Sequence, residues 1–329
     1  MTDNGIYTSD GYGNSIVMKN IDDVSTKMND IIEIDSNRYL IASETGMYLM
    51  INNDDAVLSN QFYIYNIIPN GSDSLLKYSE NGIDYKYLLL PNNQGGAGGF
   101  YNGMKTAYES LEQFDAVWVM DDDGVPSMKC LSELQKYLDK SSFISPLVCN
   151  IEKHSEMAFG TLKETNIDKV NALYPTGIVK NHANPFNGIL FKRDLMDKIG
   201  FPKKEMFIWG DENEYEARAI KNGFEPMTIL SAKHFHPKDR LVLFPDFLGR
   251  KNIVFVASSP LRCYCKYRNT SYVLVKYKGL LNLVFYVFRY LWYFIISRKF
   301  DVNNAVLFCD AVCDGIKGDF SNHNKFFKK

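Results

Sequence analysis

Residues 93–123, which read NQGGAGGFYNGMKTAYESLEQFDAVWVMDDD, constrain the fold more than any other part of the chain. Closely spaced glycines near the start predict a turn whose backbone can approach a ligand, because glycine adopts left-handed angles without steric cost. An apolar stripe at helical spacing follows, made of Phe100, Met104, Ala107 and Leu111. Residues 116–120 then form an apolar run without polar alternation, as in a strand covered on both faces.

Three aspartates, Asp121, Asp122 and Asp123, come directly after this predicted strand. The carboxyl ends of parallel strands are where open α/β sheets bind ligands. Alternate residues of an extended segment point the same way, so Asp121 and Asp123 can share one Mg²⁺ or Mn²⁺ through hard oxygen ligands. The alternative is an acidic loop that caps a following helix. The strand and glycine-rich turn before the aspartates favour the metal site.

A second group of carboxylates lies in residues 206–224, MFIWGDENEYEARAIKNGF. A helix is predicted to begin at Asp211 and to end at Asn222 and Gly223. Asp211 and Glu214 have the spacing of an N-cap and its third helical residue, which would give both of them a structural role. That explanation leaves Glu212 without a partner. The helix dipole keeps a carboxylate in the first turn ionised, which is the state that a general base requires.

Two histidines, His234 and His236, fall on one face of a predicted strand end at 232–237. Either imidazole could ligate a divalent metal.

The order of these motifs resembles that of a known family. NQGGAGGF followed by WVMDDD, then FNGILFKRDLMDKIGFP at 186–202, then the 206–224 segment and the histidine strand are similar to family-2 inverting glycosyltransferases of the GT-A fold. The resemblance covers roughly residues 65–240 and is strongest for the bacterial galactofuranosyl- and rhamnosyltransferase-like branch. It implies an α/β fold of the GT-A type, Rossmann-like, with a mostly parallel central sheet flanked by helices.

The resemblance also implies roles for individual residues. It places the general base on Glu212, with Asp211 as the alternative. It adds one histidine to Asp121 and Asp123 as ligands of Mn²⁺ or Mg²⁺, and of the two we favour His236 over His234.

Donor and acceptor sites follow from the same comparison. The expected donor-binding residues are Asn93, Gly95, Gly96, Gly98, Gly99, Asp122, Asn70 and Asp73. The family's first strand and its nucleotide-binding loop are not recognisable, and the segment 70–73 is either a remnant of a donor turn or an ordinary turn. The expected acceptor-binding residues are Trp209, Phe207, Asn187 and Gly188, with a core position as the alternative for the two aromatic residues.

The chain divides by composition into three predicted regions. A β-rich segment covers 1–60, the catalytic domain covers 61–245, and a helical, basic and aromatic region covers 246–329. No acidic residue occurs between Arg262 and Lys299. The run 280–296 is nearly long enough to span a bilayer, but a helix of this composition more often lies in the headgroup plane. A buried helix or oligomer contact and a true span are the alternatives.

Charge and cysteine content bear on the partners and the cellular location of the protein. Lys and Arg number 37 against 39 Asp and Glu, so the composition does not indicate a nucleic-acid partner. The six cysteines lack zinc spacing and are expected to be buried free thiols. With a polar N-terminus, they indicate a cytoplasmic protein, which we expect at the cytoplasmic face of the inner membrane, with homo-oligomers possible.

We therefore expect an inverting transferase in cell-surface polysaccharide synthesis. It would move galactofuranose, rhamnose or a similar sugar from a UDP- or dTDP-sugar to a saccharide acceptor, expected to be lipid-linked. The alternatives are an inactive nucleotide-sugar-binding partner in a polysaccharide-assembly complex and, less favoured, a sugar-phosphate nucleotidyltransferase. The latter lacks support because no basic glycine-rich signature is present near the N-terminus.

Overall fold

The computed structural model describes the backbone of eight strands in residues 1–89, and residues 90, 92–110, 114–121, 123–159, 164–238, 241–246 and 248–327. The chain forms two compact units, residues 1–91 and 92–329. The three-part division expected from the sequence, with boundaries after residues 60 and 245, stays a prediction.

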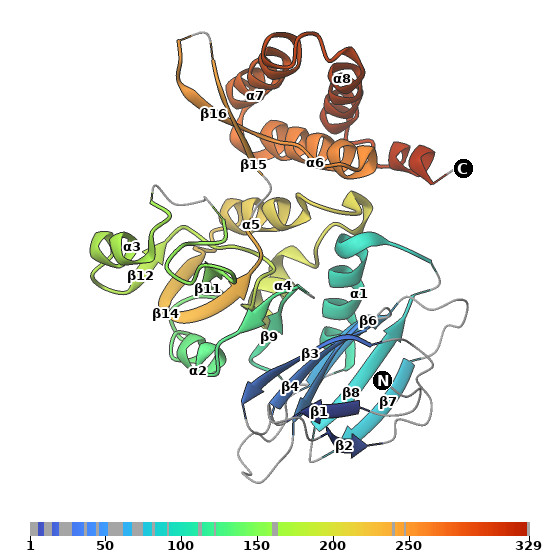
Figure 1. Cartoon of the computed structure of the whole chain (residues 1–329), viewed down its shortest axis with the longest axis vertical. Helices are drawn as coiled ribbons and strands as arrows, with labels where there is room; N and C mark the ends of the chain where they lie inside the picture. Colours follow the sequence, from blue (N-terminus) through green and yellow to red (C-terminus); the bar gives the residue numbers. More distant parts are fainter. Residues whose placement is uncertain are drawn as a thin grey trace. The chain divides into compact units, whose positions relative to one another are not determined.

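The first unit is built from β-strands (Figure 1). They are β1 (Ile6–Ser9), β2 (Ser15–Lys19), β3 (Met28–Asp35), β4 (Arg38–Ser43), β5 (Gly46–Ile51), β6 (Phe62–Ile67), β7 (Leu75–Glu80) and β8 (Ile83–Leu89). They pair as β1–β2, β3–β4–β5 and β6–β8–β7. β6 and β8 run parallel, and the other pairs are antiparallel.

The second unit contains a six-stranded sheet. Its strands are β9 (Ala116–Val119), β10 (Val125–Pro126), β11 (Phe143–Asn150), β12 (Ile178–Lys180), β13 (Ile189–Lys192) and β14 (Met227–His236). The order is β10–β14–β11–β13–β9, and β12 also pairs with β14. Only β11 and β14 pair in parallel among these described strands. The sheet is therefore mixed, and the expectation of a mostly parallel sheet was wrong, because an apolar run reveals burial but not strand direction.

Helices cover this sheet on both sides. They are α1 (Gly95–Ser110), α2 (Cys130–Gln135), α3 (Ile167–Leu173), α4 (Arg193–Ile199) and α5 (Asp211–Lys221). On β9, Val117 and Val119 pack into the cluster that includes Met104 of α1. Trp118 packs into the opposite cluster, with Leu134 of α2. The predicted helix and the strand covered on both faces are thus confirmed.

The last part of the chain is a β-hairpin followed by a group of helices. The hairpin is β15 (Leu241–Pro245) with β16 (Lys251–Phe255), and the helices are α6 (Pro260–Val273), α7 (Leu280–Trp292) and α8 (Val302–Lys317). Figure 1 shows α6, α7 and α8 side by side. Their shared core is aromatic: the Tyr290 and Phe308 rings stack, and Tyr267 packs edge-on against both. The region expected to be entirely helical therefore also contains strand β16.

Candidate functional site

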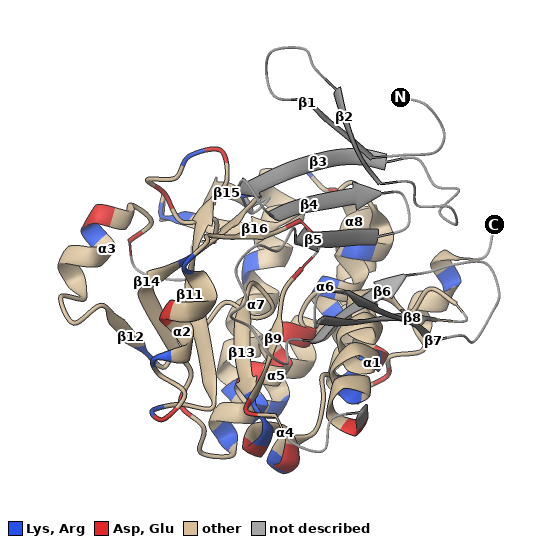
Figure 2. Ribbon diagram, turned by 90° about the horizontal axis from the view of Figure 1, so that it is seen from below, with Lys and Arg blue, Asp and Glu red and all other residues tan. Residues whose placement is uncertain are grey.

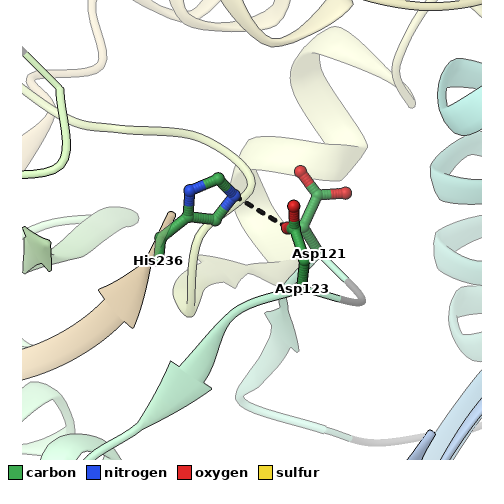
Figure 3. A group of neighbouring side chains, drawn as sticks. All are labelled: Asp121, Asp123 and His236. Carbon is green, nitrogen blue, oxygen red and sulfur yellow. Dashed lines mark ion pairs between the residues drawn. The ribbon is translucent and has the colours of Figure 1, made fainter. Parts of the chain in front are cut away.

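Two aspartates and a histidine meet where β9 and β14 end (Figure 3). Asp121 and Asp123 follow β9, and His236 is the last residue of β14. One ligand atom from each of the three side chains lies within 4.8 Å of the others. Two carboxylate oxygens and an imidazole nitrogen suit Mn²⁺, and the oxygens suit Mg²⁺. The residues present therefore fit a divalent metal.

Hydrogen bonds orient the His236 ring toward Asp123. Its Nδ1 is 2.7 Å from the carbonyl oxygen of Pro237, which accepts the Nδ1–H, and its Nε2 is 2.8 Å from Oδ1 of Asp123. This bond lowers the pKa of Asp123, against the effect of burial. Burial alone would lower the pKa of His236, but the bond to Asp123 and its negative charge outweigh burial and raise it. A backbone carbonyl on Nδ1 fixes the tautomer that leaves Nε2 for a metal.

His234 does not join this group. Its ring is fully buried between Gly124 and Gly188, whose absent Cβ atoms leave the space that it occupies. Neither ring nitrogen has a hydrogen-bond partner within the described part of the chain, and burial lowers the pKa of His234 to about 3. Of the two histidines left open by the sequence, the structure places His236 beside the aspartates. Gly188, expected at the acceptor site, packs on His234 instead, and Asn187 beside it is buried.

A loop with a strained backbone precedes the second group of carboxylates, at the start of α5. Phe207, Trp209 and Gly210 all have left-handed φ angles, of 67°, 55° and 106°. The Asn269 amide of α6 holds this loop by donating to the carbonyl oxygens of Met206, Ile208 and Trp209 at 3.0, 3.1 and 2.7 Å. Such backbone strain persists only where its surroundings over-determine it. The C-terminal helices therefore fix the start of α5.

The carboxylates of α5 occupy different environments. Asp211 is buried, and burial together with the charge of Glu212 raises its pKa well above the ordinary value; Asp121 adds to this. Burial thus disfavours the charged form of Asp211. Burial also raises the pKa of Glu216, one turn further along, to about 7. Figure 2 shows acidic residues on α5 close to β9.

Glu212 is partly exposed, and hydrogen bonds orient its carboxylate. Its Oε2 accepts the Gly210 N–H at 2.6 Å, its Oε1 accepts from Asn213 at 2.8 Å, and the Lys266 Nζ of α6 is 3.7 Å from Oε1. Both carboxylate oxygens therefore have partners on α5, its N-cap or α6.

Helix α5 starts as predicted, but its capping differs. Gly210 is the N-cap, so the expected capping pair of Asp211 and Glu214 does not form. Glu214 is instead buried in an ion pair with Arg218, at 2.9 Å, and accepts from the hydroxyl of Tyr277 at 2.7 Å. Glu212 bonds the backbone of Gly210, so the prediction that it lacked a structural partner was wrong.

The glycines expected to cradle the donor lie within α1 rather than in a turn before it. Gly95 begins the helix with a φ of 66°, and a Cβ there would collide with the carbonyl oxygen of Phe207. Asn93 accepts the Gly95 N–H at 2.9 Å. Gly96, Gly98 and Gly99 continue the first turns of α1. The close backbone approach that Gly95 permits is thus to the 206–210 loop. Asp122, Asn70 and Asp73 lie outside the described residues.

The two aromatic residues expected at the acceptor site lie in different environments. Phe207 is in the C-terminal core, stacked on His323 with ring centroids 4.8 Å apart, so its core alternative holds. Trp209 is partly exposed, and the Arg262 guanidinium lies over its ring at 5.3 Å.

Sequence reasoning missed the contribution of α6. Arg262, Lys266 and Asn269 all reach the 209–212 segment from this helix. Arg262 and Lys266 are four residues apart and so share a helix face. Their position in an aromatic, acid-free stretch was visible in the sequence, but it was interpreted only as a membrane signal.

Comparisons with known proteins identify the family of this chain. Residues 67–200 match glycosyl transferase family 2. Over 221 residues the chain is 33% identical to the galactofuranosyltransferase GlfT1 of Mycobacterium tuberculosis (strain CDC 1551 / Oshkosh), covering 65% of this chain and 71% of the relative. The galactofuranosyltransferase GlfT1 of Mycolicibacterium smegmatis (strain ATCC 700084 / mc(2)155) is 30% identical over 246 residues, covering 71% of this chain and 80% of the relative.

Among solved structures, the crystal structure of GalNAc-T7 with UDP, GalNAc and Mn²⁺ superposes with a TM-score of 0.39 at 11% identity, over 59% of this chain and 37% of that one. The family assignment rests on these sequence relatives. The chain belongs to glycosyl transferase family 2, and it is related to galactofuranosyltransferases.

Proposed function

We propose that this glycosyltransferase is an inverting, metal-dependent enzyme of the GT-A type. Its donor is a nucleotide diphosphate sugar, UDP- or dTDP-linked, carrying galactofuranose, rhamnose or a similar sugar. Its acceptor is a saccharide, lipid-linked, in cell-surface polysaccharide synthesis. The single observation that carries the proposal is the Asp121, Asp123 and His236 cluster, with the Glu212 carboxylate at the start of α5. The names of the relatives support galactofuranose as the sugar.

Asp121, Asp123 and Nε2 of His236 would hold Mn²⁺ or Mg²⁺. When bound, such an ion neutralises the charge that develops on a leaving diphosphate. His236 suits this role because its Nδ1–H is fixed on the Pro237 carbonyl.

Glu212 is the residue best suited to act as general base. In an inverting transfer one carboxylate accepts the proton of the acceptor hydroxyl as that oxygen bonds to the anomeric carbon, while the bond to the diphosphate breaks. An ionised group can accept this proton and a protonated group cannot. Glu212 is partly exposed, with the Gly210 N–H and Lys266 beside its carboxylate, whereas Asp211 is buried and burial disfavours its charged form. Lys266 and Arg262 place positive charge next to the base, where they can bind an anionic part of either substrate.

The test is nucleotide binding by isothermal titration calorimetry, with UDP, dTDP, GDP and CMP, each in Mn²⁺ and in chelator. We expect UDP or dTDP to bind in Mn²⁺ and to bind far more weakly in chelator. Asp123→Asn should remove the metal dependence of nucleotide binding. The matched control Asp168→Asn, at an exposed site on α3, should bind nucleotide as the wild type does. Failure of every nucleotide to bind would contradict the donor site. Binding without transfer to any saccharide acceptor would favour the inactive-partner alternative.

A further inference from the structure

Helix α7 presents a wide apolar face to solvent. The exposed side chains are Leu280, Leu281, Val284, Phe285 and Phe288, and Leu281 and Phe285 are 76% and 71% exposed. Their spacing of one, three and four residues puts them on one side of the helix. Large apolar side chains in a contiguous group are uncommon on a soluble surface and indicate an interaction site.

The same surface continues beyond α7. Ile295 and Ile296 in the π-helical turn Tyr293–Ser297, Phe300, and Val302 and Val306 of α8 are also exposed. An apolar hollow of about 280 Å³ lies among them, lined by Ile295, Phe300, Val302, Ala305, Val306 and Cys309. Cys309 is exposed here, as is Cys313, so the expectation that all six cysteines are buried was wrong for these two. We call the exposed apolar side chains of residues 280–306 the apolar face.

The other side of α7 is fixed in the core and cannot leave it. Leu283, Tyr286 and Tyr290 are buried against the aromatic cluster, and the Tyr290 hydroxyl accepts the Phe255 N–H at 2.9 Å. The stretch Leu280–Ser297 is long and apolar enough to cross a membrane, with a mean hydropathy of 1.5, and 28% of it is buried inside the protein. Crossing a bilayer would pull this buried side out of its packing. The helix is therefore placed to lie along a membrane surface rather than to span the membrane.

The charges that flank α7 along the chain are positive. Residues 247–300 contain no Asp or Glu. Lys276 and Lys278 precede the face along the chain, and Arg298 and Lys299 lie between its exposed Ile296 and Phe300, all four being exposed. The next acidic residue, Asp301, caps α8 by accepting the Asn304 N–H at 3.3 Å.

We infer that the apolar face docks the enzyme on the surface of an anionic lipid bilayer. Apolar side chains enter the boundary between headgroups and acyl chains, while the flanking lysines and arginines contact anionic headgroups. A contact between two copies fits less well, because a two-fold interface would bring the lysines and arginines that flank α7 towards their own copies. The inference does not depend on catalysis, but it brings the enzyme of the proposed function to a membrane surface, where its proposed lipid-linked acceptor would lie.

The test is co-sedimentation of the full chain with vesicles of phosphatidylcholine, with and without phosphatidylglycerol, at low and high salt. We expect binding to the anionic vesicles that salt weakens. The double substitution Leu281→Glu/Phe285→Glu should reduce vesicle binding by about tenfold or more, because it removes apolar contacts and adds negative charge. Arg298→Ala/Lys299→Ala should reduce binding to anionic vesicles only. Leu173→Glu is the matched control, since Leu173 is exposed on α3, outside the apolar face.

Nucleotide binding should be unchanged in all of these variants, so a failure of docking is distinguishable from a failure of the proposed function. Vesicle binding by Leu281→Glu/Phe285→Glu equal to that of the wild type would overturn the inference. So would a wild type that binds no vesicles but changes from dimer to monomer on this substitution, measured by light scattering. Wild type that resists extraction from membranes by alkaline carbonate would show that the helix spans the bilayer instead.

Discussion

Substitution of Glu216 by Gln should make the protein more stable at alkaline pH and leave its stability at acid pH nearly unchanged. Burial raises the pKa of Glu216 from its ordinary 4.5 to about 7, and the nearby charge of Glu212 adds to this. Lys278 and the Ala183 N–H act in the opposite direction. Because the folded pKa lies above the unfolded one, Glu216 is favourable to stability below pH 4.5, and this contribution is lost as the pH rises through about 7.

The size of the effect follows from the two pKa values. A difference between 4.5 and about 7 corresponds to at most about 3.5 kcal/mol, at about 1.4 kcal/mol per pKa unit. Glu216 is not fully buried, and solvent screening reduces the figure to roughly 1–2 kcal/mol. Gln cannot ionise, and its amide oxygen can still accept the Ala183 N–H. The stability of the variant should therefore not fall between pH 5 and 8 as that of the wild type does.

Urea unfolding of both proteins at several pH values measures this difference. Trp118, Trp209 and Trp292 all lie in the second unit, so tryptophan fluorescence reports the unfolding of the part that contains Glu216. The stability of Glu216→Gln relative to wild type should grow by roughly 1–2 kcal/mol from pH 5 to pH 8. Glu225→Gln, at an exposed site, is the control and should show no such growth. A difference for Glu216→Gln that does not change with pH would refute the burial argument.

Two further predictions concern the start of α5 and the start of α1. Glu212→Gln should retain nucleotide binding but lose transfer by about 10²–10⁴-fold, whereas Asp211→Asn, at a buried carboxyl whose charged form is disfavoured, should keep most activity in the same donor-to-acceptor assay. The reverse ranking would make Asp211 the base. Gly95→Ala should lower the free energy of unfolding by about 1–2 kcal/mol, because the residue is left-handed and its Cβ would collide with the Phe207 carbonyl. Gly96→Ala, where a Cβ meets nothing within 4 Å, should be neutral or stabilising by calorimetric Tm.

Local patterns predicted the parts of the site that depend on local chain geometry. The apolar run 116–120 and the aspartates after it appear in the structure as β9 followed by Asp121 and Asp123. The start of α5 at Asp211 also follows its sequence signals. Strand direction could not be predicted in this way, because pairing partners lie far apart in the sequence. The roles of His234 and His236 could not be separated for the same reason, since only the fold places Gly124 and Gly188 around one of them.

The part of the site that was missed comes from α6, and its contacts explain why the C-terminal helices belong to the same unit as the sheet. Arg268 and Asn269 are fully buried polar residues in an aromatic core, and burial without partners would be costly. Both donate to backbone carbonyls of the strained loop, with Nη2 of Arg268 2.8 Å from the Met206 oxygen. The loop in turn sets the position of Glu212, and Lys266 on the same helix faces that carboxylate. The helix that supports the site thus packs on one side against the loop and on the other against the core that holds α7. The site and the apolar face are consequently parts of one packed structure, in which the orientation of α6 determines both.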